Sequence, residues 1–128
     1  MFSGKTDEMI RQIHRAQFAK LKIQVFKPQI DARYSIEDVA SHDKTLLKAT
    51  PIVDAREIRS QVRPETEVVG IDEGQFFSDE LVEVATDLAN SGRRVLIAGL
   101  DTDWRGRPFG PMPILMAVAE LVHKQHAI

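Results

Sequence analysis

The chain has 128 residues, 43% of them hydrophobic and 28% charged, a balance typical of one globular domain with a core of its own. Its formal net charge of -2 and the lack of a lysine- or arginine-rich tract argue against nucleic acid or an anionic membrane as a partner. The chain contains no cysteine for disulfides or thiolate chemistry, and it shows no bilayer-spanning apolar run and no signal-peptide pattern, so we expect a cytoplasmic protein.

The first residues match the second half of a phosphate-binding loop. Gly4, Lys5 and Thr6 fill the last three positions of G-x-x-x-x-G-K-[ST], in which backbone N–H groups surround phosphate oxygens, the lysine adds charge and the hydroxyl binds Mg²⁺. By itself the tripeptide is equally compatible with a frayed terminus. Apolar residues then recur at near-helical spacing, which predicts a helix where such a site needs one; they are Met9, Ile10, Ile13, Phe18 and Leu21.

The next elements are a strand, a polar segment and a short helix. Apolar and polar residues alternate over 22–27, which predicts a strand that stops at Pro28. Residues 29–50 are polar and indicate a mobile excursion. A helix is expected from Asp54, with Glu57 at the capping-box spacing and Pro64 closing it.

Two apolar runs, 68–71 and 95–98, predict buried parallel strands. Between them we expect a helix that Ser78 caps and Gly92 ends. A loop over 106–113, a helix over 114–124 and the start of a strand at 127–128 complete the pattern. The alternation predicts an α/β fold with a mostly parallel sheet, right-handed crossovers and helices on both faces.

Two acidic residues follow the first of these runs. Ligands bind at the carboxyl ends of parallel strands, so Asp72 is expected at the active edge, holding Mg²⁺ opposite Thr6. Glu73 points elsewhere and is the natural general base for a nucleophile that attacks a γ-phosphate. A strand-terminal Asp-Glu is also a common cap, and whether the nucleophile is water or a hydroxyl stays open at this point.

Five segments resemble, in order and spacing, the type II thymidine kinases, and the similarity covers the whole chain. They are Met1–Thr6, Asp31–Ser35, Ser41–Asp43, Asp72–Phe77 and Pro108–Gly110. The resemblance implies one P-loop NTPase-like (RecA-like) kinase core over 1–128. It also implies transfer of the ATP γ-phosphate to the 5′-hydroxyl of thymidine, giving dTMP in nucleotide salvage.

The resemblance also implies roles for individual residues. Glu73 would be the catalytic base, and Thr6 and Asp72 would hold Mg²⁺. Asp31 and Arg33 would approach the phosphates, although a surface ion pair explains them equally well. The implied ATP contacts are Met1, Phe2, Ser3, Gly4, Lys5, Thr6, Asp31, Arg33, Asp72, Glu73, Gly74 and Gln75.

For the nucleoside, the resemblance implies an aromatic pocket. Trp104 stands where the family usually has phenylalanine against the thymine ring, and it can stack on a pyrimidine. Phe76 and Phe109 match family aromatics that could line the same pocket or simply pack in the core. Arg105 and Arg107 are compatible with phosphate contacts or with solvation. Ser41, His42 and Asp43 are adjacent in the chain, so they cannot face one another as a catalytic triad must.

Two segments implied by the resemblance are missing from these 128 residues. One is a strand and glycine before the phosphate loop, expected beside the Asp72 strand; the other is a C-terminal segment that would hold a structural Zn²⁺ and close over thymidine. We therefore expect these residues alone to be inactive, and the family implies a homotetramer.

Two alternatives remain open. A nucleic-acid-stimulated P-loop ATPase would also explain Asp72–Gln75, which has the D-E-x-Q form found in helicases, although the chain lacks a basic patch. A catalytically silent nucleotide-binding or oligomerisation fragment is the other. DNA-stimulated ATP hydrolysis would favour the first alternative.

Overall fold

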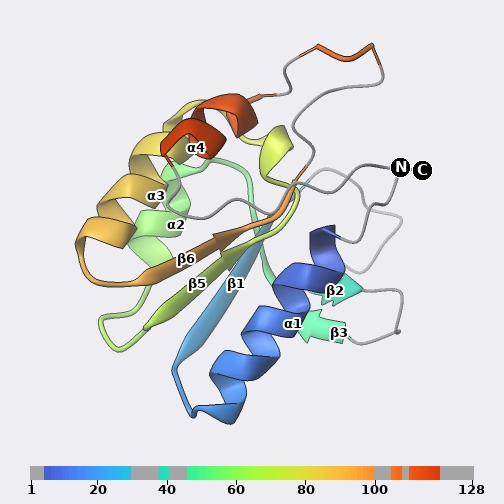
Figure 1. Ribbon diagram of the computed structural model, residues 1–128. Coiled ribbons are helices and arrows are strands. Elements are labelled where there is room, and N and C mark those ends of the chain that lie inside the picture. The colour runs from blue at the N-terminus through green and yellow to red at the C-terminus, as the bar shows by residue number, and fades with distance from the viewer. Residues whose placement is uncertain (1–4, 30–37, 41–45, 100–104, 108–109, 119–128) are drawn as a thin grey trace.

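A four-stranded, all-parallel sheet forms the centre of the molecule (Figure 1). The structure, a computed structural model, describes residues 5–29, 38–40, 46–99, 105–107 and 110–118, without the side chains of 5–7, 38–40, 46–48 and 116–118. The strands lie in the order β4 (Thr50–Ile52), β1 (Ile23–Pro28), β5 (Val68–Ile71) and β6 (Arg94–Ile97). The expected α/β fold with a parallel sheet is therefore confirmed.

Helices cover both faces of this sheet (Figure 1). On one face lies α1 (Lys5–Phe18), and on the other lie α2 (Arg56–Gln61), α3 (Glu80–Asn90) and α4 (Met112–Val118). Each face has its own core, because successive strand residues point to opposite sides. In β1, Val25 packs with the α1 side chains, whereas Phe26 belongs to the larger core with Ile71 and Leu81.

The position of β5 corrects one expectation. We expected a strand preceding the phosphate loop to lie beside the strand that ends at Asp72. That strand, β5, pairs with β1 along one edge and with β6 along the other, from Val68 to Ile71 in both ladders. No edge of β5 is left for a further strand, so the expected placement is wrong.

The interpretation of 29–50 as one mobile excursion is also wrong in part. Residues 38–40 (β2, Asp38–Ala40) and 46–48 (β3, Leu46–Lys48) form an antiparallel pair. The strand β4 then begins at Thr50 and pairs with the end of β1. Its brevity hid it from the sequence pattern, and Pro51 is tolerated because β4 lies at the edge of the described sheet.

Helix ends agree with the sequence in some places and not in others. The capping-box contact is confirmed, since the Asp54 N–H donates to Glu57 Oε1 (2.9 Å), although α2 itself starts at Arg56. Gly92 adopts a positive φ of 91° just after α3, as expected of a helix-ending glycine. The proposed Ser78 cap is wrong: the cap position of α3 is Asp79, and the Ser78 hydroxyl contacts Glu80 Oε1 (3.3 Å).

The C-terminal elements differ from expectation at the helix start. We expected a loop to Pro113 and a helix from 114, but α4 begins at Met112 and carries Pro113 in its first turn, where proline is tolerated. The expected strand at 127–128 lies outside the described residues. Among those that are described, no helix has the length and apolar character needed to cross a membrane.

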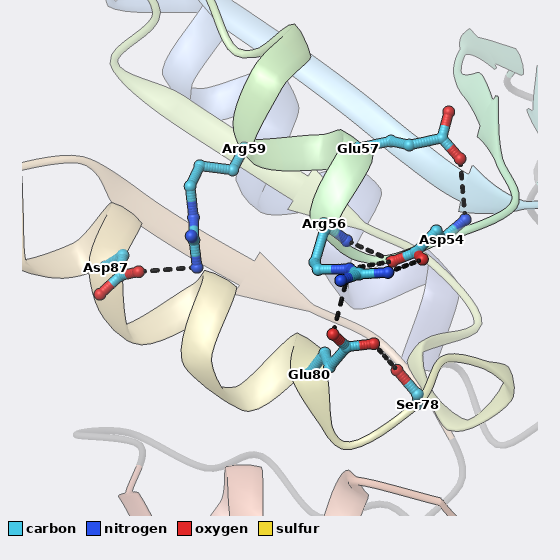
Figure 2. A network of polar contacts seen from close by, with 7 residues as sticks. All are labelled: Asp54, Arg56, Glu57, Arg59, Ser78, Glu80 and Asp87. Carbon is cyan, nitrogen blue, oxygen red and sulfur yellow. Dashed lines mark hydrogen bonds and ion pairs between the residues drawn. The ribbon is translucent and has the colours of Figure 1, made fainter.

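Charged side chains tie α2 to α3 on the outer surface (Figure 2). Arg56 Nε lies 3.1 Å from Glu80 Oε2, and Arg59 Nη2 lies 2.7 Å from Asp87 Oδ2. Arg56 also contacts Asp54, and this hydrogen bond lowers the pKa of the Asp54 carboxyl. Because these groups are exposed or only partly buried, each pair contributes little to stability on its own.

Candidate functional site at the carboxyl edge of the sheet

The start of α1 and the end of β5 lie at the same edge of the sheet (Figure 1). The 14 residues of α1 span about 21 Å at 1.5 Å per residue, and the six of β1 span about 20 Å. A short turn joins the end of α1 to the start of β1, so the first turn of α1, with Lys5 and Thr6, lies level with the carboxyl ends of the strands. The expected coincidence of a helix N-terminus with the acidic strand end is present.

Asp72 continues β5 by one residue and is fixed by the neighbouring strand. Its N–H donates to the Phe26 carbonyl oxygen (2.9 Å), and only 7% of the residue is exposed. Two residues on, the Gly74 N–H donates to the Ala98 carbonyl (2.9 Å), just beyond β6. The acidic pair is thus held from both sides, by β1 and by the chain that follows β6.

Glu73 lies between these two anchors in the left-handed region, with φ 54° and ψ 44°. Non-glycine residues occupy this region uncommonly, and such conformations concentrate at functional sites. Glu73 precedes a single 3₁₀ turn, η1 (Gly74–Phe76), which also lies at the carboxyl edge (Figure 1). The turn begins with a residue that bears a carboxylate where glycine would be conformationally easier.

The surroundings of Glu73 favour its protonated form more than water does. Burial raises the pKa of its carboxyl, and the adjacent charge of Asp72 raises it further, while a hydrogen bond from the Gln75 side chain lowers it. The net effect is a raised pKa. A carboxylate with a raised pKa is a stronger base than an exposed one, which suits it to accept a proton near neutral pH.

Gln75 is buried, with 3% of the residue exposed. A β-carbon at Gly99 would lie 2.7 Å from its Oε1 atom, and one at Gly110 would overlap its carbonyl oxygen. The sequence predicts only an ATP contact for Gln75 and indicates no role for Gly99 or Gly110. Only their packing in the fold points to them, because neither glycine is near Gln75 in the chain.

The two phenylalanines that follow have different surroundings. Phe77 is 5% exposed and belongs to the larger core, whereas Phe76 is 46% exposed at the carboxyl edge. Phe76 is therefore available for a ligand in a way that Phe77 is not. The expectation that Phe76 lines the nucleoside pocket stays a prediction.

Several expected site residues lie outside the described part of the chain. The side chains of Lys5 and Thr6 are not described. The remaining ones, with no structural account, are Met1, Phe2, Ser3, Gly4, Asp31, Arg33, Trp104 and Phe109. Arg105 and Arg107 are described and exposed.

The described residues contain no group of three or more histidine, cysteine, aspartate or glutamate side chains that could hold a metal ion. A magnesium ion held mainly by phosphate oxygens and water needs only one or two protein carboxylates. Asp72, an acidic side chain at the end of β5, has the oxygen donors that such an ion prefers. The residues present therefore fit Mg²⁺ bound together with a nucleotide, rather than an ion held by protein alone.

Comparison with known proteins gives one consistent family. The family model described as thymidine kinase matches residues 1–128. Over all 128 residues the chain is 64% identical to a thymidine kinase of Bdellovibrio bacteriovorus, 56% to one of Bacteroides thetaiotaomicron and 54% to one of a Rhodothermus species. The chain spans 63%, 64% and 60% of the length of these relatives, respectively.

Proposed function

The chain belongs to the thymidine kinase family, and from this premise we propose that the protein transfers the γ-phosphate of ATP to the 5′-hydroxyl of thymidine. One observation carries the proposal: an acidic pair, buried at Asp72 and half-buried at Glu73, ends the central strand β5 at the edge where the helix that follows Gly4 begins. Phosphoryl transfer needs positioning and charge stabilisation more than covalent chemistry, and this edge supplies anchored carboxylates beside a helix N-terminus.

In this proposal Asp72 and Glu73 have different roles. Glu73 accepts the proton of the 5′-hydroxyl as that oxygen attacks the γ-phosphorus, the bond from the γ-phosphorus to the β-phosphate oxygen breaks and ADP leaves. The raised pKa of Glu73 favours this proton transfer. Asp72 and Thr6 would hold Mg²⁺, and the bound ion would supply positive charge that neutralises the phosphates. The first turn of α1 and the residues before it, Met1–Thr6, bind the donor phosphates through backbone N–H groups and the Lys5 charge.

The remaining contacts are proposed from the family. Asp31 and Arg33 approach the phosphates, and Phe76, Trp104 and Phe109 contact the thymine ring. Assembly as a homotetramer belongs to the same proposal, and the molecular mass in solution tests it.

The test compares two glutamate-to-glutamine variants of the full-length protein. Product dTMP is measured from γ-labelled ATP and thymidine, and ATP affinity is measured separately by calorimetry. We expect Glu73→Gln to keep ATP affinity and to lower kcat by roughly 10²- to 10⁴-fold, the usual contribution of a general base. Glu83→Gln, an exposed change in the first turn of α3, is the matched control and is expected to keep full turnover.

Different outcomes reject different parts of the proposal. If the unaltered protein makes no dTMP, thymidine phosphorylation is wrong, and DNA-stimulated release of phosphate in its place would favour the ATPase alternative. If dTMP forms and Glu73→Gln turns over normally, the assignment of Glu73 as the base is wrong.

A further inference from the structure

Among the residues that the structure describes, Gln75 is the most buried polar residue at the carboxyl edge. It lies in η1, two residues after Glu73, and only 3% of the residue is exposed. The turn around it is closed by hydrogen bonds from the Phe76 N–H to the Glu73 carbonyl and from the Phe77 N–H to the Gly74 carbonyl, both 3.1 Å. Its backbone therefore has little freedom to move relative to Glu73.

Glycines from three segments pack around this turn. A β-carbon at Gly99 would lie 2.7 Å from Gln75 Oε1, and one at Gly74 would lie 2.9 Å from Ile97 Cγ2, both closer than real β-carbons approach. Gly110 has a positive φ of 56°, and a β-carbon there would lie 3.1 Å from the Gln75 carbonyl carbon. The amide group and the backbone of Gln75 thus occupy space that any larger residue at Gly99 or Gly110 would need.

The confined amide acts on Glu73. The Gln75 side chain hydrogen-bonds the Glu73 carboxyl group, and its Oε1 faces Gly99. A carboxylate accepts hydrogen bonds, so the amide NH₂ is the donor in this contact. With Oε1 against Gly99, the NH₂ group is the part of the amide that bonds Glu73, and this bond can orient the carboxylate.

We propose that Gln75 is a positioning residue: its buried amide fixes the orientation of the Glu73 carboxylate, and Gly99 and Gly110 keep the amide in place. This inference rests on the proposed function, because its effect on kcat assumes that Glu73 is the catalytic base. It replaces the expectation that Gln75 contacts ATP, because a side chain this deeply buried and already bonded to Glu73 presents little surface to a nucleotide.

Gln75→Met tests the inference, since methionine has a similar length and fills the space without a donor. Misplacing a reacting group by about 1 Å costs roughly 10²-fold, so we expect kcat to fall by about that factor while the KM values for ATP and thymidine stay within about twofold. A tenfold or larger rise in the ATP KM with kcat retained would mean a direct nucleotide contact and would overturn the inference. Unchanged kcat and KM would overturn it as well.

A double variant separates action through Glu73 from an independent effect. If Gln75 works only by orienting Glu73, adding Gln75→Met to Glu73→Gln lowers kcat no further. A second, independent loss of kcat in the double variant contradicts the inference.

Gly99→Ala moves the amide without removing it, which keeps the test valid if Gln75→Met fails to fold. The β-carbon displaces Oε1, and we expect kcat to fall with KM little changed. Gly106→Ala is the control, because a β-carbon there meets nothing within 4 Å, and it keeps the original kcat. Full kcat in Gly99→Ala would count against the inference.

Failure of the proposed function is recognised separately. If the unaltered protein phosphorylates no thymidine, crystal structures of it and of Gln75→Met replace the kinetics. A Glu73 carboxylate that changes position between the two structures supports the positioning role, and one that stays in place refutes it.

Discussion

Replacing Gly110 by alanine perturbs the candidate site through its contact with Gln75, without changing a proposed catalytic residue. Gly110 has a φ of 56°, and the position that a β-carbon would take there faces the backbone of Gln75. Alanine therefore meets two penalties: a left-handed backbone conformation and an overlap with the Gln75 carbonyl oxygen. Because the overlapping atom belongs to the backbone, a rotamer change of a side chain cannot relieve the overlap.

Gly106→Ala isolates the first penalty. Gly106 also has a positive φ, 79°, but a β-carbon there meets nothing within 4 Å. We expect the left-handed conformation alone to cost about 1–2 kcal/mol in both variants. The overlap at Gly110 adds about 1–3 kcal/mol, the usual cost of overpacking, so Gly110→Ala loses about 2–5 kcal/mol in total.

Urea unfolding followed by circular dichroism measures both variants, and turnover is measured on the folded protein. We expect Gly110→Ala to be less stable than Gly106→Ala and to lose turnover, because the shift of Gln75 passes to Glu73. Equal unfolding free energies for the two variants would refute the packing argument. A destabilised Gly110→Ala protein with full turnover would show that Gln75 can move without consequence for the site.

Three further changes have distinct expected results. The raised pKa of Glu73 means that its contribution to stability is fully present below the unfolded pKa, near 4.5, and is lost as pH rises through the folded pKa. Glu73→Gln should therefore raise the thermal midpoint at neutral pH, and a gain that persists undiminished at pH 3 would contradict this sign. Phe77→Ala empties a core position and should cost about 3–5 kcal/mol in urea unfolding, whereas Phe76→Ala should cost far less and instead raise the thymidine KM; the reverse order would be inconsistent with their burial. Arg59→Ala removes an exposed pair with Asp87 and should cost at most about 1 kcal/mol, so a larger loss in the same assay would mean that the α2–α3 contacts act as a network.

Local sequence patterns predicted the helices and strands whose formation depends mainly on neighbouring residues in the chain. The apolar run at 68–71 makes a buried strand wherever it lies, and the spacing from Met9 to Ile13 gives a helix one apolar face. The strand β4 escaped prediction because three residues with a central proline carry no period; its pairing with β1 is what makes it a strand.

The site divides in the same way. The acidic pair was predictable, because a strand end in a parallel sheet is a binding edge whatever the rest of the fold. The confinement of Gln75 was not, since Gly99 and Gly110 lie far from it in the chain and only tertiary packing brings them to it. The αL conformation of Glu73 also follows from the anchors on both sides, not from its own preference.

The hydrogen bonds that hold Asp72 and Gly74 also affect local opening of the sheet. The amides of Asp72 and Gly74 bond outward to two different neighbours, so neither can exchange its hydrogen while the sheet stays closed. We therefore expect the acidic pair to open together with the sheet, unlike a site carried on a loop. Mild denaturant that loosens surface segments leaves this part of the site assembled until the sheet itself gives way.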